Sequence, residues 1–345
     1  MLHLGRNTLA KCVVYVATSN QNIDYAKWGN IVLRSIHDNI TEDVDYRWYT
    51  NDAETVPCVI DEFPVEIIEL PKHDLEGLDG DQAFALPAFS LCPDSLEHAA
   101  REGKYERAIY FDLDMVACGN LDELVTCDLE GKPMASNMDW HKDFGMDGHY
   151  DYWRNLDHPD ASEKFIALLK SVPMTFNAGL VVADCAEWRK LNLPDFRMWC
   201  DLYYQRYCDQ EFLNIMINGN FKVISNAYNI RTWTHLNHME TEEDFIRELT
   251  RHHTEDRRIV QYLYEQKYFH YQFERVKKEM QIGVPLHRLG QGIFCADFSL
   301  LIKYLKDDER LLGQMCNAEH LELLENIIEM RDKKYAEHIR HATNS

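Results

Sequence analysis

The sequence lacks several patterns that mark common protein classes. Its ten cysteines form no CxxC pair, which argues against a zinc ribbon, and a chain of 345 residues does not need a disulfide framework. Neither GxGxxG nor GxxxxGKS/T occurs, so neither a typical dinucleotide-binding fold nor a P-loop NTPase is indicated. No apolar run approaches the length of a membrane span.

Positive charge is also scarce. The sequence has 36 Lys and Arg residues against 58 Asp and Glu residues, a net charge of −22. This charge argues against a general nucleic-acid or anionic-membrane surface, although a bound metal would still allow a phosphate ligand. Residues 1–11 contain no apolar segment of the signal-peptide kind, and several cysteines lie in apolar runs, as buried thiols do. We therefore expect a cytoplasmic protein.

The most informative stretch is residues 108–116, an apolar run that contains Asp112 and Asp114. Its apolar part predicts a buried strand of an α/β sheet. If the strand continues through both acids, their side chains face the same side near its carboxyl end, where open α/β sheets bind ligands. Such a pair can hold a divalent cation that binds a phosphate, serve as nucleophile and general acid of a phosphatase, or be ordinary surface acids.

The rest of the chain predicts strands that alternate with helices, which is typical of a layered α/β fold. Strands are expected at residues 11–17, 45–50, 65–70, 133–139, 175–183 and 221–224. Helices are expected at residues 23–37, 95–102, 186–190, 208–214, 241–265, 299–312 and 320–342. We divide the chain into a catalytic domain, residues 1–285, and a C-terminal helical extension, residues 286–345.

Four polar features are further candidates for a site. The loop at residues 18–22 follows the first strand, where such folds place a nucleotide. The Asn177-Ala178-Gly179 sequence lets a backbone approach a ligand closely beside an amide, or is a plain tight turn. Asp209 begins a predicted helix, where it is either a ligand contact or an N-cap. His270 lies in a short aromatic run that reads as a strand.

Taken in order, these motifs resemble the nucleotide-sugar glycosyltransferases of GT-A fold, most closely family 8, which includes glycogenin and bacterial galactosyltransferases. The resemblance covers roughly residues 12–275. It rests on residues 110–116 with 119–124, residues 176–180 with 188–189, residues 209–214 and residues 227–229. It implies a Rossmann-like mixed sheet flanked by helices, followed here by the C-terminal helical extension.

The resemblance also implies a cofactor and a donor. Asp112, Asp114 and His270 would hold Mn²⁺ or Mg²⁺, with a nitrogen ligand favouring Mn²⁺, or His270 would be a packed strand residue. The cation would bind the diphosphate of a UDP-sugar and neutralise the leaving group. Ala17, Thr18 and Ser19 would line the uridine and ribose.

The sugar side of the site follows from the same resemblance. Asn177, Ala178 and Gly179 would face the sugar and the acceptor. Three residues would contact the transferred sugar, with the last beside the anomeric carbon: Asp139, Asp209 and Gln210. We expect transfer of a hexose from UDP-glucose or UDP-galactose to a glycan or other hydroxyl acceptor, with retention of configuration.

The chain departs from the family pattern in two places. The usual Gly and Lys-Pro-Trp do not follow His270, so Lys277 or Lys278 is expected to supply the lysine that binds the diphosphate. The arginine that often precedes the strand with the DxD motif, here Asp112 and Asp114, has no counterpart in residues 82–91.

Two alternatives stay open from the sequence. Residues 112–116 also fit the first motif of haloacid-dehalogenase-like phosphatases, although that motif would begin late in the chain and no later acidic Mg²⁺ motif is evident. A non-catalytic sugar-nucleotide-binding module is the other alternative. The C-terminal helices lack the basic face of membrane-surface helices, which favours capping of the domain or formation of a homo-oligomer.

Overall fold

The computed structural model describes residues 10–22, 26–141, 163–203, 208–231, 241–254, 256–261, 277–278, 281, 298–306, 309–310 and 318–343. The chain forms two compact units that alternate along the sequence. The first consists of Met1–Ala26, Ile40–Leu113 and Leu121–Asn226, and the second of Lys27–Asn39, Asp114–Asn120 and Ala227–Ser345. The division at residue 285 into a catalytic domain and an extension stays a prediction.

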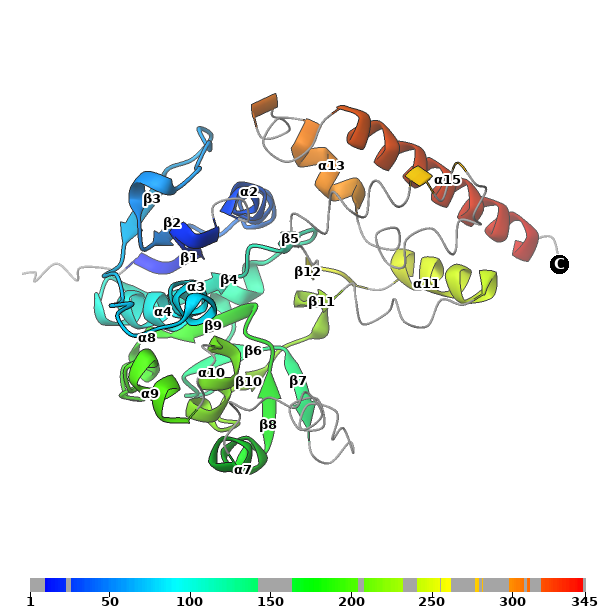
Figure 1. Cartoon of the computed structure of the whole chain (residues 1–345). Coiled ribbons are helices and arrows are strands. Elements are labelled where there is room, and N and C mark those ends of the chain that lie inside the picture. Colours follow the sequence, from blue (N-terminus) through cyan, green and yellow to red (C-terminus); the bar gives the residue numbers. More distant parts are fainter. Residues whose placement is uncertain are drawn as a thin grey trace, which may run out of the picture. The chain divides into compact units, whose positions relative to one another are not determined.

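A seven-stranded mixed sheet forms the first unit, in the order β10-β6-β9-β4-β1-β2-β3 (Figure 1). Its strands are β1 (Ala10–Thr18), β2 (Asp45–Thr50), β3 (Val65–Glu69), β4 (Tyr105–Phe111), β6 (Met134–Ser136), β9 (Leu180–Asp184) and β10 (Lys222–Val223). All neighbouring pairs are parallel except those of β9, which runs antiparallel to both β4 and β6. The expected α/β class with a mixed sheet flanked by helices is confirmed.

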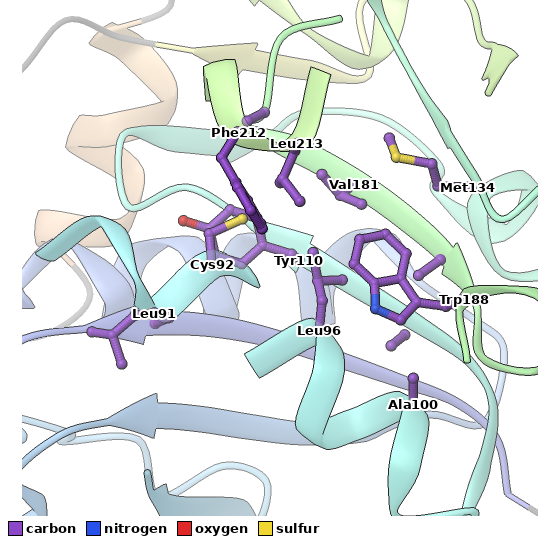
Figure 2. Packing of buried hydrophobic residues seen from close by; sticks show 14 of the residues in the cluster. Leu91, Cys92, Leu96, Ala100, Tyr110, Met134, Val181, Trp188, Phe212 and Leu213 are labelled. Atoms are coloured by element: carbon purple, nitrogen blue, oxygen red, sulfur yellow. The ribbon is translucent and has the colours of Figure 1, made fainter. Parts of the chain in front are cut away.

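The core of this unit follows from uninterrupted apolar runs in its central strands. Residues 12–16 of β1 are fully buried, as expected for a strand with both faces covered. The helices α4 (Leu91–Arg101) and α8 (Cys185–Trp188) pack on β4 and β9. Leu96 and Trp188 are both fully buried there (Figure 2).

The other elements of the first unit surround this sheet. The helices are η1 (Asn20–Asn22), η2 (Ala53–Thr55), α3 (Gly80–Phe89), α5 (Asp122–Thr126), α7 (Glu163–Ser171), α9 (Phe196–Tyr203) and α10 (Asp209–Ile217). A separate antiparallel pair consists of β7 (Met138–His141) and β8 (Met174–Phe176). The helix η4 (Asn226–Tyr228) follows β10 and contains the point at which the chain passes from the first unit to the second.

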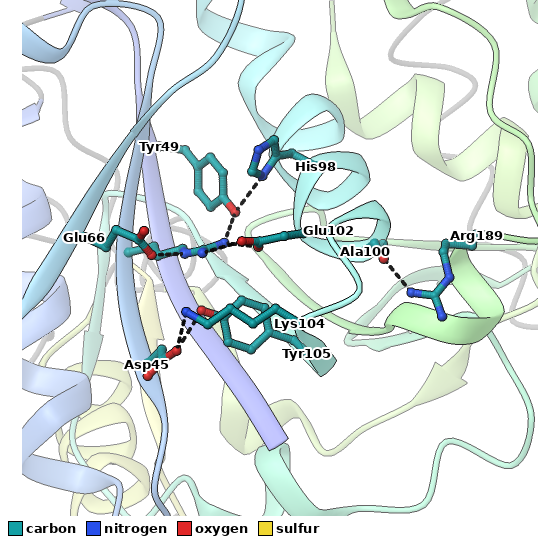
Figure 3. Close-up of polar contacts among 10 residues, drawn as sticks. Asp45, Tyr49, Glu66, His98, Ala100, Glu102, Lys104, Tyr105 and Arg189 are labelled. Carbon is teal, nitrogen blue, oxygen red and sulfur yellow. Dashed lines mark hydrogen bonds and ion pairs between the residues drawn. The ribbon is translucent and has the colours of Figure 1, made fainter. Parts of the chain in front are cut away.

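One buried cation stabilises the edge of the sheet. Arg47 on β2 is 1% exposed, and its guanidinium donates to Glu66 at 2.7 Å and to both carboxylate oxygens of Glu102 at 2.7 and 3.0 Å (Figure 3). The guanidinium carbon of Arg47 also lies 4.9 Å from the ring centre of Tyr105. A buried charge needs such partners, because an unpaired one would cost several kcal/mol, roughly 3–5. This arrangement ties β2 to β3 and to the end of α4.

The second unit contains a three-stranded sheet in the order β11 (Ile230–Arg231), β12 (Ile259–Gln261) and β5 (Met115–Ala117). Its helices are α2 (Trp28–Asn39), α11 (Glu242–Thr254), α13 (Phe298–Lys306) and α15 (Ala318–Thr343). In α2, Ser35 Oγ accepts a hydrogen bond from Ala117 N at 2.9 Å, and Asn39 Nδ2 donates to Ala117 O at 3.3 Å. None of the helices described here is both long and apolar enough to cross a membrane.

Several strands and one helix end or break at other residues than the sequence predicted. The DxD strand ends at Phe111, so Asp112 and Asp114 do not lie in one continuing strand. The strand expected at residues 175–183 is interrupted at 177–179, and residues 133–139 form parts of two strands. The helix expected at residues 241–265 ends at Thr254, and β12 follows it. In the first two cases the strand breaks where a polar residue, Asp112, Asn137 or Asn177, lies within an apolar run.

Candidate functional site

The first unit brings the end of β4 next to the turn between β8 and β9. Phe111 is paired with Leu180 in the antiparallel register, and Asp112 N donates to Gly179 O at 2.8 Å. The Asp112 side chain is half-buried, and its Oδ1 accepts a hydrogen bond from Tyr110 Oη at 2.6 Å. Residues about 65 positions apart in the chain thus share one sheet edge, as expected from their order in the sequence.

The turn at residues 177–179 is held from several sides. Its Asn177 N donates to Asn137 O, and Asn177 Oδ1 accepts from Gly179 N, both at 3.1 Å. The buried Ser136 hydroxyl lies 2.9 Å from Asn177 O and 2.7 Å from Leu180 O. The sequence predicted that this turn belongs to the site, but it did not single out Ser136 or Asn137 as its supports.

Gln210, in the first turn of α10, faces the same turn. Its Oε1 accepts hydrogen bonds from Asn177 Nδ2 and from Ala178 N, both at 3.1 Å. A backbone N–H can only donate, so the oxygen of Gln210 must be the atom that faces Ala178. The amide nitrogen of this half-buried side chain is then the atom that Gln210 can offer to a ligand as a hydrogen-bond donor.

Asn214 fixes α10 to β8. Its Oδ1 accepts from Phe176 N at 2.7 Å, and its Nδ2 donates to Phe176 O at 2.8 Å and to Gln210 O at 2.9 Å. Asn214 and Gln210 are one helical turn apart, so both face β8 and its turn. The sequence placed Asn214 inside a motif without giving it a role; an amide four residues after Gln210 was the available signal.

Asp209 lies near Asp112 in the first unit. Burial, then the Asp112 carboxylate, then Glu211 raise the pKa of Asp209 to about 8. Burial also raises the pKa of Asp112, against the lowering effect of the hydrogen bond from Tyr110. Two such carboxylates share protons or are neutralised by a cation. The N-cap of α10 is Cys208, so the interpretation of Asp209 as an N-cap is wrong.

A buried thiol lies beside these acids. Cys92, near the start of α4, is buried and interacts with Asp209, and burial is the main reason that the pKa of its thiol is raised well above the usual value. Cys92 and the ring of Tyr110 lie close together below α10 (Figure 2). Cys92 and Tyr110 are both buried beside the two acids, and burial of this kind strengthens the electrostatic interactions of the acids.

The loop predicted to bind uridine is well anchored in the first unit. Ala17, Thr18 and Ser19 are buried. Thr18 Oγ1 accepts a hydrogen bond from the indole Nε1 of Trp48 at 2.8 Å, and Ser19 Oγ accepts from Gln21 N at 3.2 Å. The side chains of Thr18 and Ser19 thus support the fold, and their contact with the uridine and ribose stays a prediction.

Asp139 lies at an irregularity of the β7–β8 pair. Met138 pairs with Phe176 but Trp140 pairs with Thr175, so Asp139 is the extra residue of a β-bulge. Bulges redirect side chains and are common next to active sites. Asp139 is half-buried, and the sequence did not indicate the bulge.

Asp114 belongs to the second unit, where its partner is a residue that the sequence did not suggest. Gln261 Nε2 donates to Asp114 Oδ1 at 3.1 Å, and both side chains are buried, at 4% and 9% exposure. The sequence predicted a helix over residues 241–265, and such a helix does not bring Gln261 next to Asp114. Lys277 forms an ion pair with Glu319 of α15, and His270 lies outside the described residues.

The side chains that could hold a cation offer oxygen atoms. Within the described ranges, no three His, Cys, Asp or Glu side chains gather closely enough to hold a metal ion by themselves. Asp112 and Asp114 are carboxylates, and the neighbour of Asp114 is the amide of Gln261. Oxygen donors of these kinds, taken residue by residue, suit a hard divalent cation such as Mg²⁺ or Mn²⁺.

Carboxylates and side-chain amides at the strand ends of a mixed α/β sheet are typical of an α/β enzyme. A comparison with protein families identifies its kind: the family described as Glycosyl transferase family 8 matches residues 99–256. The matched segment contains the DxD residues, Gln210 and Asn214, and the match indicates that the protein is a glycosyltransferase. The phosphatase and the non-catalytic module are therefore set aside.

Solved structures of other glycosyltransferases resemble this chain at low identity. The galactosyltransferase LgtC in complex with donor and acceptor sugar analogues has a TM-score of 0.48 and 14% identity, with 89% of this chain and 97% of that chain covered. Mouse xyloside xylosyltransferase 1 has a TM-score of 0.43 and 13% identity, with 73% and 97% covered. Among the curated proteins, none matches this sequence.

Proposed function

We propose that this glycosyltransferase moves a hexose from UDP-glucose or UDP-galactose to a hydroxyl group of a glycan or similar acceptor, with retention of configuration. The observation that supports this proposal is the meeting of Asp112, Asp209 and Gln210 at the turn of residues 177–179. Carboxylates and amides that converge at one sheet edge are suited to a polar sugar, because each can bind a hydroxyl group.

The cation of this proposal is Mn²⁺ or Mg²⁺. Asp112 and Asp114 would hold it, and His270 is the proposed nitrogen ligand. When bound, the cation supplies a positive charge that binds the diphosphate and stabilises it as a leaving group. Tyr110 donates a hydrogen bond to Asp112 Oδ1, which orients this carboxylate.

The remaining roles are assigned to the residues of this chain as follows. Gln210 donates a hydrogen bond through its amide nitrogen beside the anomeric carbon, while Ala178 N–H holds its oxygen in place. Asp209 and Asp139 bind hydroxyl groups of the transferred sugar. Ala17, Thr18 and Ser19 line the uridine and ribose. Lys277 binds the diphosphate, which requires that it exchange its ion pair with Glu319 for the ligand.

The test is a thermal-shift and hydrolysis assay of the full chain with UDP- and GDP-sugars, in Mn²⁺, Mg²⁺ or EDTA. We expect one UDP-hexose to raise the melting temperature only with a divalent cation, and to be hydrolysed slowly. Asp114→Ala should lose both effects, whereas Glu130→Gln, at an exposed ion pair with Lys222, should keep them. Equal stabilisation by every nucleotide sugar in EDTA would contradict the proposal.

Location and assembly are proposed from the sequence alone. We propose a cytoplasmic protein whose C-terminal helices cap the domain or join two copies. Light scattering coupled to size exclusion would distinguish these two roles, because a chain of 40.6 kDa gives twice that mass as a dimer.

A further inference from the structure

We infer that Gln261 is a direct ligand of the cation held by Asp114. The inference rests on the proposed cation dependence and names a residue that neither the family match nor the sequence motifs assign. It starts from the position of Gln261 at the last residue of β12, which pairs with β5 immediately after Asp114. Gln261 is opposite Met115 in this pairing, so the backbone itself brings its side chain next to Asp114.

The distance between the two side chains suits a shared cation. Gln261 Nε2 lies 3.1 Å from Asp114 Oδ1. Two neighbouring ligands of an octahedral cation with bonds of about 2.1 Å are separated by about 3 Å. If the Gln261 amide rotates by half a turn, its oxygen takes the place of its nitrogen. The hydrogen bond to Asp114 is then lost, and the oxygen can bind the cation beside Asp114. No backbone movement is required.

The burial of Asp114 and Gln261 explains why an amide lies beside this carboxylate. A carboxylate as buried as Asp114 is costly unless a cation or donors compensate its charge. Without a cation, Gln261 compensates as a donor; with a cation, its oxygen becomes a neutral ligand. A neutral oxygen from Gln261 does not favour Mn²⁺ over Mg²⁺ as strongly as an imidazole would. Residue 261 would therefore help to set the cation preference of this enzyme.

The test measures cation binding rather than turnover. Mn²⁺ binding by the full chain is followed by electron paramagnetic resonance in the presence of UDP, and Mg²⁺ affinity by competition. Gln261→Ala should weaken both cations at least about tenfold. Gln261→His should keep Mn²⁺ binding but weaken Mg²⁺, so that the ratio of their affinities rises about tenfold.

A matched control is an amide of α2 that contacts β5, the strand with which β12 pairs. Asn39 donates to Ala117 O at the far end of β5, so Asn39→Ala removes a similar amide without touching Asp114. Its cation affinities should stay within about twofold of the wild type. A wild type that binds Mn²⁺ while both Gln261 variants match it overturns only the present inference. A wild type that binds no cation overturns the proposed function as well.

If Gln261 only orients Asp114 or packs in the strand, its replacement by His would weaken Mn²⁺ and Mg²⁺ to the same extent. An unchanged ratio in a folded Gln261→His protein would therefore also overturn direct ligation. Circular dichroism melting without cation shows whether each variant is folded. Gln261→Glu is a further variant, and it should bind Mg²⁺ more tightly than the wild type because it adds a carboxylate to the site.

Discussion

Asn214 on α10 and Phe176 on β8 are joined by two hydrogen bonds that satisfy both backbone groups of Phe176. Asn214 Oδ1 accepts from Phe176 N at 2.7 Å, and Asn214 Nδ2 donates to Phe176 O at 2.8 Å. Because Gln210 lies one turn earlier on the same helix, this link sets the distance between Gln210 and the turn that follows Phe176.

We predict that Asn214→Ala lowers both stability and transfer activity. The change leaves the buried N–H and C=O of Phe176 without their partner, which costs roughly 1–3 kcal/mol for each such group. Urea denaturation measures the loss of stability, and the kcat of the remaining folded protein should fall because Gln210 is no longer held. The exposed Asn220→Ala is the control, with a change within about 0.5 kcal/mol. Equal stability of the two variants would disprove the role given to Asn214.

We predict that Thr18→Val destabilises the protein by about 1–3 kcal/mol. Valine has nearly the shape of threonine but cannot accept the hydrogen bond from the indole of Trp48, which is buried. Thr18→Ser keeps the acceptor and should recover most of the loss. Thermal melting of the three proteins checks this, and a Val variant as stable as the wild type would mean that the indole finds another partner.

We predict opposite effects of alanine at two glycines. A Cβ at Gly119 would lie 2.8 Å from the backbone oxygen of Arg257 and 2.9 Å from Arg258 Cδ, so Gly119→Ala should cost about 1–3 kcal/mol. A Cβ at Gly80, in the first turn of α3, would meet no atom within 4 Å. Gly80→Ala should stabilise by up to about 1 kcal/mol, because alanine favours helix. Equivalent melting temperatures would show that the loop at Gly119 adjusts freely.

We predict that the ion pair of Arg47 and Glu102 makes stability fall in acid. The hydrogen bonds from Arg47 lower the pKa of Glu102 below its ordinary value of 4.5, so this stabilisation is complete above about pH 4.5 and is lost as the pH falls through the lowered pKa. Glu102→Gln should cost about 1–2 kcal/mol at pH 7, since Glu66 still pairs with Arg47. The difference in the free energy of unfolding between wild type and variant should become smaller below pH 4, as measured by urea denaturation. A gap that does not depend on pH would contradict this.

Much of the fold could be predicted from local pattern. The runs that became β1, β2 and β3 were expected within one residue or so, because each is rich in the β-branched and aromatic residues that favour strands. The α3 helix was missed, although Asp79 and Gln82 form a capping box that marks its start. A tight turn at residues 177–179 was one of two alternatives that the sequence left open, because a short turn leaves no periodicity to decide between them.

The sequence by itself indicated the kind of enzyme and the candidate residues of the site, since the order of DxD, Asn-Ala-Gly and Asp-Gln motifs is a property of the chain. Only the tertiary structure decided which of them are neighbours. The antiparallel insertion of β9 beside β4 places Gly179 against Asp112, and the pairing of β12 with β5 places Gln261 against Asp114. Strand partners distant in sequence are chosen by burial and by backbone hydrogen bonding across the whole sheet, and no local stretch of residues carries that information.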